Sequence, residues 1–269
     1  MTTLMLTKHQ GLGNDFLVAY EPPVDDLAQL ARRLCDRRRG VGADGLLVAS
    51  QSNGHTARMR LYNADGSLAE MSGNGIRCFA QAIARRDRSL ADQSILTDAG
   101  VRLVALSATS DDSTIMARVG MGEVVTLDEP AGWDQLGCHP DRPVAHLGLG
   151  NPHSVVGVGA GELVDVDLAA LGSKVPQVNL EIIEPGPETN AITMRVHERG
   201  VGVTEACGTG ACASAYAARS WGFVERDADQ VVVHMDGGIA VVSFAEGAQA
   251  AVVLTGPATY VATVEVEIE

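Results

Sequence analysis

The feature of this sequence that most constrains its fold is an internal duplication. Four short segments of the first half recur in the second half, in the same order and about 135 residues later. The pairs are Gly11–Asn14 with Gly148–Asn151, Met59–Leu61 with Met194–Val196, Gly73–Gly75 with Gly208–Gly210, and Ala80 with Ala215. Ordered matches at one spacing are the signature of repeated structural units. The chain, with 269 residues, has room for two domains of ordinary size, and we predict two similar ones.

Each half has the pattern of a mixed α and β domain. Apolar and β-branched runs between Gly and Asp turns predict strands, among them Val231–Met235, Ala251–Thr255 and Tyr260–Ile268. The Ala-rich segments Gly75–Arg86 and Gly210–Trp221 predict helices at equivalent places in the repeat. These patterns predict an α+β fold with largely antiparallel sheets.

The expected boundary between the domains follows from the repeat. We place the N-terminal domain at residues 1–125 and the C-terminal domain at residues 126–260, and we expect a last strand at about 261–269 to complete the N-terminal domain. The stretch Asp128–Pro143 has little periodic pattern and three prolines. It is therefore the expected crossing between the two halves.

The composition excludes several classes of function. A net charge of −14 and an isoelectric point near 4.8 oppose binding to nucleic acid or to an anionic membrane surface. No apolar run approaches the length of a membrane span, and no secretory signal is visible at the N-terminus, so we expect a cytoplasmic protein. The five cysteines show no metal-ligand spacing, which disfavours a zinc site.

Two glycine-rich segments mark the starts of the duplicated helices. They are Ser72–Gly75 and Cys207–Gly210. Unpaired N–H groups and the positive end of the helix dipole suit a carboxylate or a phosphate, and two such starts facing each other would hold one anion. A thiol at Cys207 would there be favoured as thiolate. The plainer alternatives are tight turns, an ordinary N-cap at Ser72 and a small buried side chain at Cys207.

A set of motifs over nearly the whole chain, in order, resembles the diaminopimelate epimerase family. The motifs are Gly11–Phe16, Asn63–Ser67, Gly73–Cys78, Gly150–His153, Val178–Asn179, Glu198–Gly200 and Ala206–Gly210. The resemblance implies two pseudo-symmetric domains, each a mostly antiparallel, barrel-like sheet around a central helix, and a homodimer. It also implies an isomerase of lysine biosynthesis that interconverts LL- and meso-diaminopimelate without pyridoxal phosphate or metal.

The resemblance also implies roles for individual residues. In the family, two cysteines on opposite sides of the substrate α-carbon remove and return a proton, and Cys207 matches one of them. Glu198 and His153 would lie next to the reacting centre, while the N–H groups at both helix starts would hold the substrate carboxylate. Binding of diaminopimelate would use Asn14, Asn63, Gly73, Asn74, Asn151, Asn179, Glu198, Arg199, Gly208 and Thr209. The plainer interpretations are turn-forming asparagines and a surface ion pair between Glu198 and Arg199.

One residue departs from the family pattern. Ser72 stands where the second catalytic cysteine belongs, and Cys78, inside the helix, does not replace it. A serine hydroxyl is much less acidic than a thiol, so two-base epimerisation should be impaired. Three explanations fit: an engineered Cys→Ser change, a natural serine that still relays a proton, or another activity, such as a racemase, a dehydratase or a non-catalytic amino-acid-binding homologue. The first two are favoured because every distal-end binding residue is present.

Overall fold

The computed structural model describes residues 2–69, 71–245 and 248–268. The chain forms two compact units: the first comprises Met1–Val119 and Gly256–Glu269, the second Gly120–Thr255. The expected boundaries were 125/126 and 260/261. Among the described residues, no helix is both long and apolar enough to cross a bilayer.

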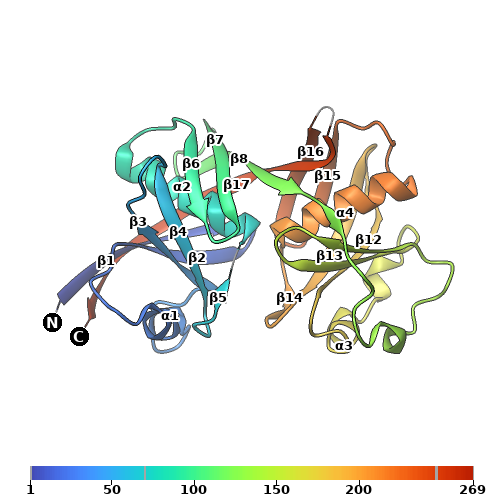
Figure 1. Cartoon of the computed structure of the whole chain (residues 1–269), viewed down its shortest axis with the longest axis horizontal. Helices are drawn as coiled ribbons and strands as arrows, with labels where there is room; N and C mark the ends of the chain where they lie inside the picture. The colour runs from blue at the N-terminus through green and yellow to red at the C-terminus, as the bar shows by residue number, and fades with distance from the viewer. Residues whose placement is uncertain (1, 70, 246–247, 269) are drawn as a thin grey trace. The chain divides into compact units, whose positions relative to one another are not determined.

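Unit 1 is a sheet wrapped around one helix (Figure 1). Hydrogen-bonded strand pairs run in the closed order β1-β2-β3-β4-β6-β7-β8-β17-β1, with β5 beside β4. The pairs β2–β3 and β4–β6 are parallel, and the other pairs with a defined register are antiparallel. Its elements are β1 (Thr2–Gly11), β2 (Asn14–Tyr20), α1 (Leu27–Cys35), β3 (Gly45–Ser50), β4 (Ala57–Asn63), β5 (Leu68–Ala69), α2 (Gly73–Asp87), β6 (Gln93–Thr97), β7 (Gly100–Ala108) and the first part of β8 (Thr114–Glu123).

Unit 2 repeats this topology element by element. Strands β11–β12 and β13–β15 are the parallel pairs, in the places that β2–β3 and β4–β6 hold in unit 1. Its elements are β9 (Val125–Thr126), η1 (Trp133–Leu136), β10 (Val144–Gly148), β11 (Pro152–Gly157), η2 (Leu163–Asp165), α3 (Leu168–Gly172), β12 (Asn179–Pro185), β13 (Ala191–Glu198), β14 (Gly202–Thr204), α4 (Gly208–Trp221), β15 (Gln230–Met235), β16 (Gly238–Ala245) and the first part of β17 (Ala248–Ile268). The duplication in the sequence is therefore a duplicated fold, and the α+β prediction is confirmed.

The two helices that cover β3 explain why this strand is apolar along its whole length. Every residue from Gly73 to Ala84 of α2 is buried, and α2 contacts strands β1 to β4. On the outer side of β3, Leu30 and Leu34 of α1 pack against Leu46 and Val48. Strand β3 is therefore covered on both faces, which is why it reads as a continuous apolar run and not as an alternating one.

The connections between the units differ from the expected crossing. Both unit boundaries fall within strands, one in β8 and one in β17. The two strands expected at the C-terminus are a single strand, β17, because no turn interrupts the alternating residues between them. The Pro-rich stretch Asp128–Pro143 lies inside unit 2, where Trp133 and Leu136 contribute to a hydrophobic cluster.

Arg77 holds the first turn of α2 in place by hydrogen bonds within unit 1. Its side chain is fully buried and donates hydrogen bonds to the Gly73 carbonyl (3.1 Å), to Asn74 Oδ1 (2.9 Å) and to the Pro257 carbonyl of β17 (3.1 Å). Because these acceptors are held by one planar guanidinium, Arg77 ties β17 to the start of the helix.

Replacing this guanidinium should destabilise the fold. We expect Arg77→Met to lower the free energy of unfolding by about 2–4 kcal/mol, because buried acceptors would lose a charged donor. Urea unfolding followed by circular dichroism measures the change, with the exposed Arg39→Met as the matched control. An Arg77→Met midpoint equal to that of the control would show that these hydrogen bonds contribute nothing.

Candidate functional site

The two helix starts have the same local geometry. Ser72 and Cys207 are the N-cap residues of α2 and α4, with φ/ψ of −140°/124° and −127°/115°. The N–H of Gly75 donates to Ser72 Oγ at 3.0 Å, and the N–H of Gly210 donates to Cys207 Sγ at 3.3 Å. Serine and cysteine therefore fill one structural role in the two units, and the interpretation of Ser72 as an N-cap is confirmed.

The start of α4 also offers donors that the fold leaves unused. No hydrogen bond among the described residues uses the N–H of Gly208 or Thr209, although both residues are buried. Unpaired N–H groups at the positive end of a helix bind carboxylates well. The local geometry thus suits the negative end of a small ligand, as the sequence analysis expected of these two residues.

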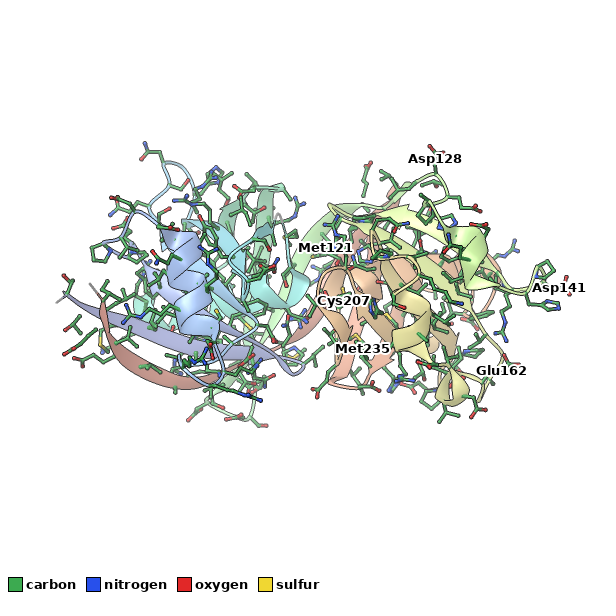
Figure 2. The ribbon with its side chains drawn as sticks, turned by 90° about the horizontal axis from the view of Figure 1, so that it is seen from below. Met121, Asp128, Asp141, Glu162, Cys207 and Met235 are labelled. Atoms are coloured by element: carbon green, nitrogen blue, oxygen red, sulfur yellow. The ribbon has the colours of Figure 1, made fainter. Side chains whose placement is uncertain are left out.

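A chain of hydrogen bonds leads from Cys207 into the core of unit 2. Cys207, labelled in Figure 2, is the N-cap residue of α4. Its Sγ lies 3.5 Å from Thr209 Oγ1, and Asn151 Nδ2 donates to the same hydroxyl at 3.3 Å. Asn151 Oδ1 lies 2.9 Å from His153 Nε2, and His153 Nδ1 lies 2.6 Å from Glu181 Oε1. Four of the expected site residues are thus adjacent, together with one glutamate that was not expected.

The environment of Cys207 favours the thiol. Burial raises the pKa of Cys207 well above its ordinary value, and the nearby carboxylates of Glu198 and Glu181 raise it further. Hydrogen bonds from Thr209 and Gly210 lower this pKa but do not offset the burial. The expected preference for thiolate is therefore not found: the donors at the helix start are present, but desolvation and like charge outweigh them.

Glu198 is also shifted toward its neutral form. Burial raises its pKa, as does the charge of Glu181, whereas a hydrogen bond from Thr204 lowers it. The Thr204 hydroxyl donates to Glu198 Oε1 at 2.6 Å. No ion pair of the described residues joins Glu198 to Arg199, so the interpretation of this dipeptide as a surface salt bridge is wrong.

Three buried groups next to α4 have the chemistry of metal ligands. Ligand atoms of His153, Glu181 and Cys207 lie within 4.8 Å of one another. However, the 2.6 Å between His153 Nδ1 and Glu181 Oε1 is a hydrogen-bond distance. Two ligands on one zinc ion, each at about 2.0–2.2 Å in tetrahedral geometry, lie further apart than that. The pair as arranged shares a proton instead of a metal.

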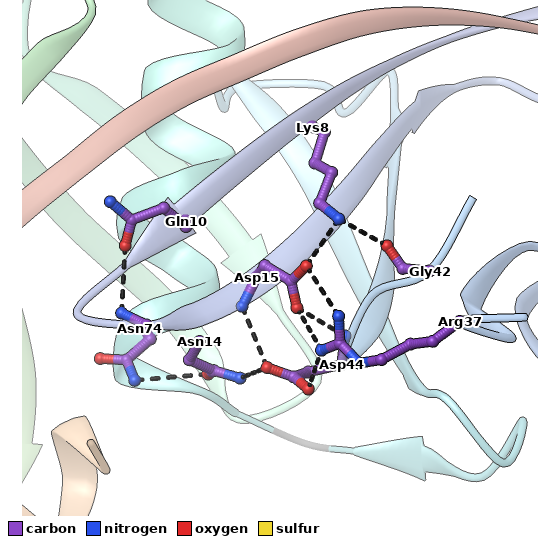
Figure 3. A network of polar contacts seen from close by, with 9 residues as sticks. Lys8, Gln10, Asn14, Asp15, Arg37, Gly42, Asp44 and Asn74 are labelled. Carbon is purple, nitrogen blue, oxygen red and sulfur yellow. Dashed lines mark hydrogen bonds and ion pairs between the residues drawn. The ribbon is translucent and has the colours of Figure 1, made fainter. Parts of the chain in front are cut away.

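In unit 1, a polar network holds the residues around the start of α2 (Figure 3). Arg77 donates to Asn74 Oδ1, Asn74 Nδ2 donates to Asn14 Oδ1 at 3.3 Å, and Asn14 Nδ2 donates to Asp44 Oδ2 at 2.6 Å. Arginine can only donate and an ionised aspartate can only accept. The orientation of both asparagine amides is therefore fixed from the two ends of the network.

The remaining predicted site residues are held by local hydrogen bonds. Asn63 donates to Ser67 Oγ at 2.9 Å within a turn, as the plainer interpretation of the asparagines expected. Asn179 donates to the Pro152 carbonyl at 3.0 Å and accepts from the Arg199 N–H at 2.9 Å. These bonds join the start of β12 to the start of β11 and to the residue after β13. The Arg199 side chain is exposed.

Sequence reasoning missed two charged residues that the structure places at these helix starts. They are Glu181 in unit 2 and Arg77 in unit 1, and both side chains are fully buried. Each is flanked by apolar residues in a segment that is otherwise core, such as Leu180-Glu181-Ile182. A charge in such a run is a usable signal, because buried charges need dedicated partners.

The hydroxyl of Thr209 provides a test of how Cys207 is tuned. We expect Thr209→Val to raise the pKa of Cys207 and slow its alkylation by iodoacetamide at pH 8 by about threefold to tenfold, because the thiolate would lose a donor. Mass spectrometry of the Cys207 peptide gives the rate. Thr209→Ser keeps a hydroxyl and should react like the parent chain; equal rates for Thr209→Val and Thr209→Ser would contradict the assignment.

Comparison with known proteins identifies the family. The family model for diaminopimelate epimerase matches residues 6–127 and 146–261. A diaminopimelate epimerase from Desulfitobacterium hafniense is 39% identical over 95% of this chain and 95% of its own length. Another, from Halothermothrix orenii, is 35% identical over 99% of both chains.

Solved structures share the fold at much lower identity. A phenazine biosynthesis protein of the PhzF family from Bacillus anthracis superimposes with a TM-score of 0.78, covering 100% of both chains at 16% identity. A hydroxyproline epimerase from Agrobacterium vitis gives 0.70 at 15% identity, covering 99% of this chain and 91% of its own. On the family model and the near-full-length relatives, this chain belongs to the diaminopimelate epimerase family.

Proposed function

We propose that this protein interconverts LL- and meso-diaminopimelate by removing and returning the α-hydrogen as a proton, with Cys207 as its main acid and base. Family membership supports the substrate and the reaction. The observation that carries the role of Cys207 is its position: a buried thiol at the start of α4, beside the unused N–H groups of Gly208 and Thr209. These donors would hold the substrate carboxylate while the sulfur reaches the α-carbon.

Substrate binding would supply the positive charge that the Cys207 thiol needs to ionise. Cys207 is kept protonated by burial and by the charges of Glu198 and Glu181. The α-ammonium of an amino acid is positive, and near these carboxylates it would offset their charge and lower the pKa of Cys207. Thiolate would then form where it is needed, next to the α-hydrogen, and the thiol that results would return a proton to carbon in the reverse direction.

The proposal gives Ser72 a weaker role. It caps α2 in the way that Cys207 caps α4, so the substitution preserves the helix start. The hydroxyl is too weak an acid to form an anion near neutral pH. We propose that exchange of the α-hydrogen by Cys207 is retained and that the lack of a second thiol at position 72 limits net epimerisation. The family also suggests a homodimer in the cytoplasm, which sedimentation and fractionation would test.

Hydrogen exchange on each stereoisomer tests this assignment. In deuterium oxide, proton NMR should show loss of the α-hydrogen mainly from the isomer that presents it to Cys207, with little net epimerisation. Ser72→Cys should restore epimerisation, because a second thiol would then be available. Equal and fast turnover of both isomers by the parent chain would contradict the proposal.

Two alternatives give different results in the same experiment. A non-catalytic amino-acid-binding homologue would bind diaminopimelate in a calorimeter and exchange no hydrogen. A racemase or dehydratase for another amino acid would act on a different member of a substrate panel. The presence of Asn63, Asn151, Asn179 and Arg199 weighs against a substrate without a charged far end.

A further inference from the structure

Glu181 is a buried carboxylate to which the proposed reaction assigns only the effect of its charge on Cys207. It lies in β12 between Leu180 and Ile182, and its side chain is fully inaccessible to solvent. Its Oε1 contacts His153 Nδ1 at 2.6 Å, whereas its Oε2 has no hydrogen-bond partner among the described residues. A buried carboxylate is costly unless a charged or hydrogen-bonded partner compensates it, so this pair needs an explanation.

The start of α4 is shaped to admit this carboxylate. A Cβ atom at Gly210 would lie 2.5 Å from Glu181 Oε1 and 3.2 Å from Cys207 Sγ. Any side chain at position 210 would therefore displace Glu181 from the helix start. The glycine that permits capping by Cys207 also permits the close approach of Glu181.

The hydrogen bonds from His153 through Asn151 and Thr209 to Cys207 share one direction, and His153 donates the opposite way to Glu181. As the side chains are oriented, both nitrogens of the His153 ring face oxygen atoms, Glu181 Oε1 and Asn151 Oδ1. Two acceptors suit a ring that carries a proton on each nitrogen. Asn151 then points its Nδ2 at Thr209 Oγ1, and this hydroxyl, which accepts from Asn151, has its own proton left to donate to Cys207 Sγ.

We propose that Glu181 is a positioning residue for Cys207: its charge holds His153 with two ring protons, which orients the Asn151 amide and directs the Thr209 hydroxyl at the sulfur. This series of hydrogen bonds does not transfer the proton of the reaction. The proton of the reaction moves between Sγ and the substrate α-carbon, and the Thr209 donor stabilises the thiolate that remains. As a statement about catalysis this inference rests on the proposed function, but the arrangement of protons does not.

The direction in which Glu181→Gln changes the alkylation rate of Cys207 separates this proposal from a simple charge effect. Glu181→Gln removes a negative charge near Cys207, and by charge alone it should lower the pKa of Cys207 and accelerate alkylation. The proposal expects the reverse: a neutral His153 ring no longer fixes Asn151, Thr209 loses its orientation, and alkylation of Cys207 by iodoacetamide at pH 8 slows by about threefold or more. Acceleration, or an unchanged rate, would overturn it.

Two further variants serve as controls for general effects of structure and charge on the alkylation rate. Asn151→Leu removes the hydrogen bonds between His153 and Thr209 and leaves the Glu181 carboxylate in place. It must therefore also slow the alkylation of Cys207. Glu205→Gln removes an exposed charge two residues from Cys207 and should leave the rate unchanged. Circular dichroism confirms that each variant is folded before its rate is compared.

The protonation of His153 gives a readout that does not depend on Cys207. In the full chain labelled with ¹⁵N-histidine, both ring nitrogens of His153 should have the shifts of protonated nitrogens at pH 7, and Glu181→Gln should convert the ring to a neutral tautomer. The His153→Gln variant identifies the signals by their loss. A neutral ring in the parent chain would refute the proposal, whereas failure of hydrogen exchange on diaminopimelate alone would refute only the proposed function.

Discussion

The structure depends on how the first turn of a helix is satisfied when the helix is buried inside a sheet. The N–H groups of such a turn have no partners in the helix itself and little access to water. In both units the N-cap side chain, Ser72 or Cys207, accepts one of them, and the glycine three residues on lets that side chain approach. In unit 2, the N–H groups of Gly208 and Thr209 have no hydrogen-bond partner among the described residues. Enclosing the central helix thus leaves donors of the kind that suit an anion at its start.

The same enclosure sets the chemistry of Cys207. A helix start alone would favour thiolate, but burial and two carboxylates keep the thiol protonated. The same enclosure constrains the partners of Glu181. A carboxylate buried this deeply is stable only with hydrogen-bond partners such as His153. Those partners then lie in fixed orientations beside the sulfur of Cys207.

Much of this arrangement follows from the sequence, and the parts that do not have physical reasons. The repeat predicted the two units, and the Ala-rich runs predicted α2 and α4, because a buried helix needs small residues and leaves a strong composition signal. The expected crossing is wrong: Asp128–Pro143 lacks periodicity, but it lies in unit 2, where Trp133 and Leu136 join a hydrophobic cluster. The strand β17 instead crosses a unit boundary without any change of pattern. The pKa of Cys207 depends on Glu181, which only the parallel pairing of β11 and β12 brings beside His153.

The central claim is that the Cys207 thiol carries the proton. The most direct test is mass-spectrometric detection of deuterium at the α-carbon of diaminopimelate incubated in deuterium oxide with the parent chain and with Cys207→Ala. Alanine fills the space of the Cβ and leaves the fold in place, which a urea unfolding midpoint would verify. The account predicts incorporation by the parent and none above the uncatalysed background by Cys207→Ala. Undiminished incorporation by folded Cys207→Ala would contradict it.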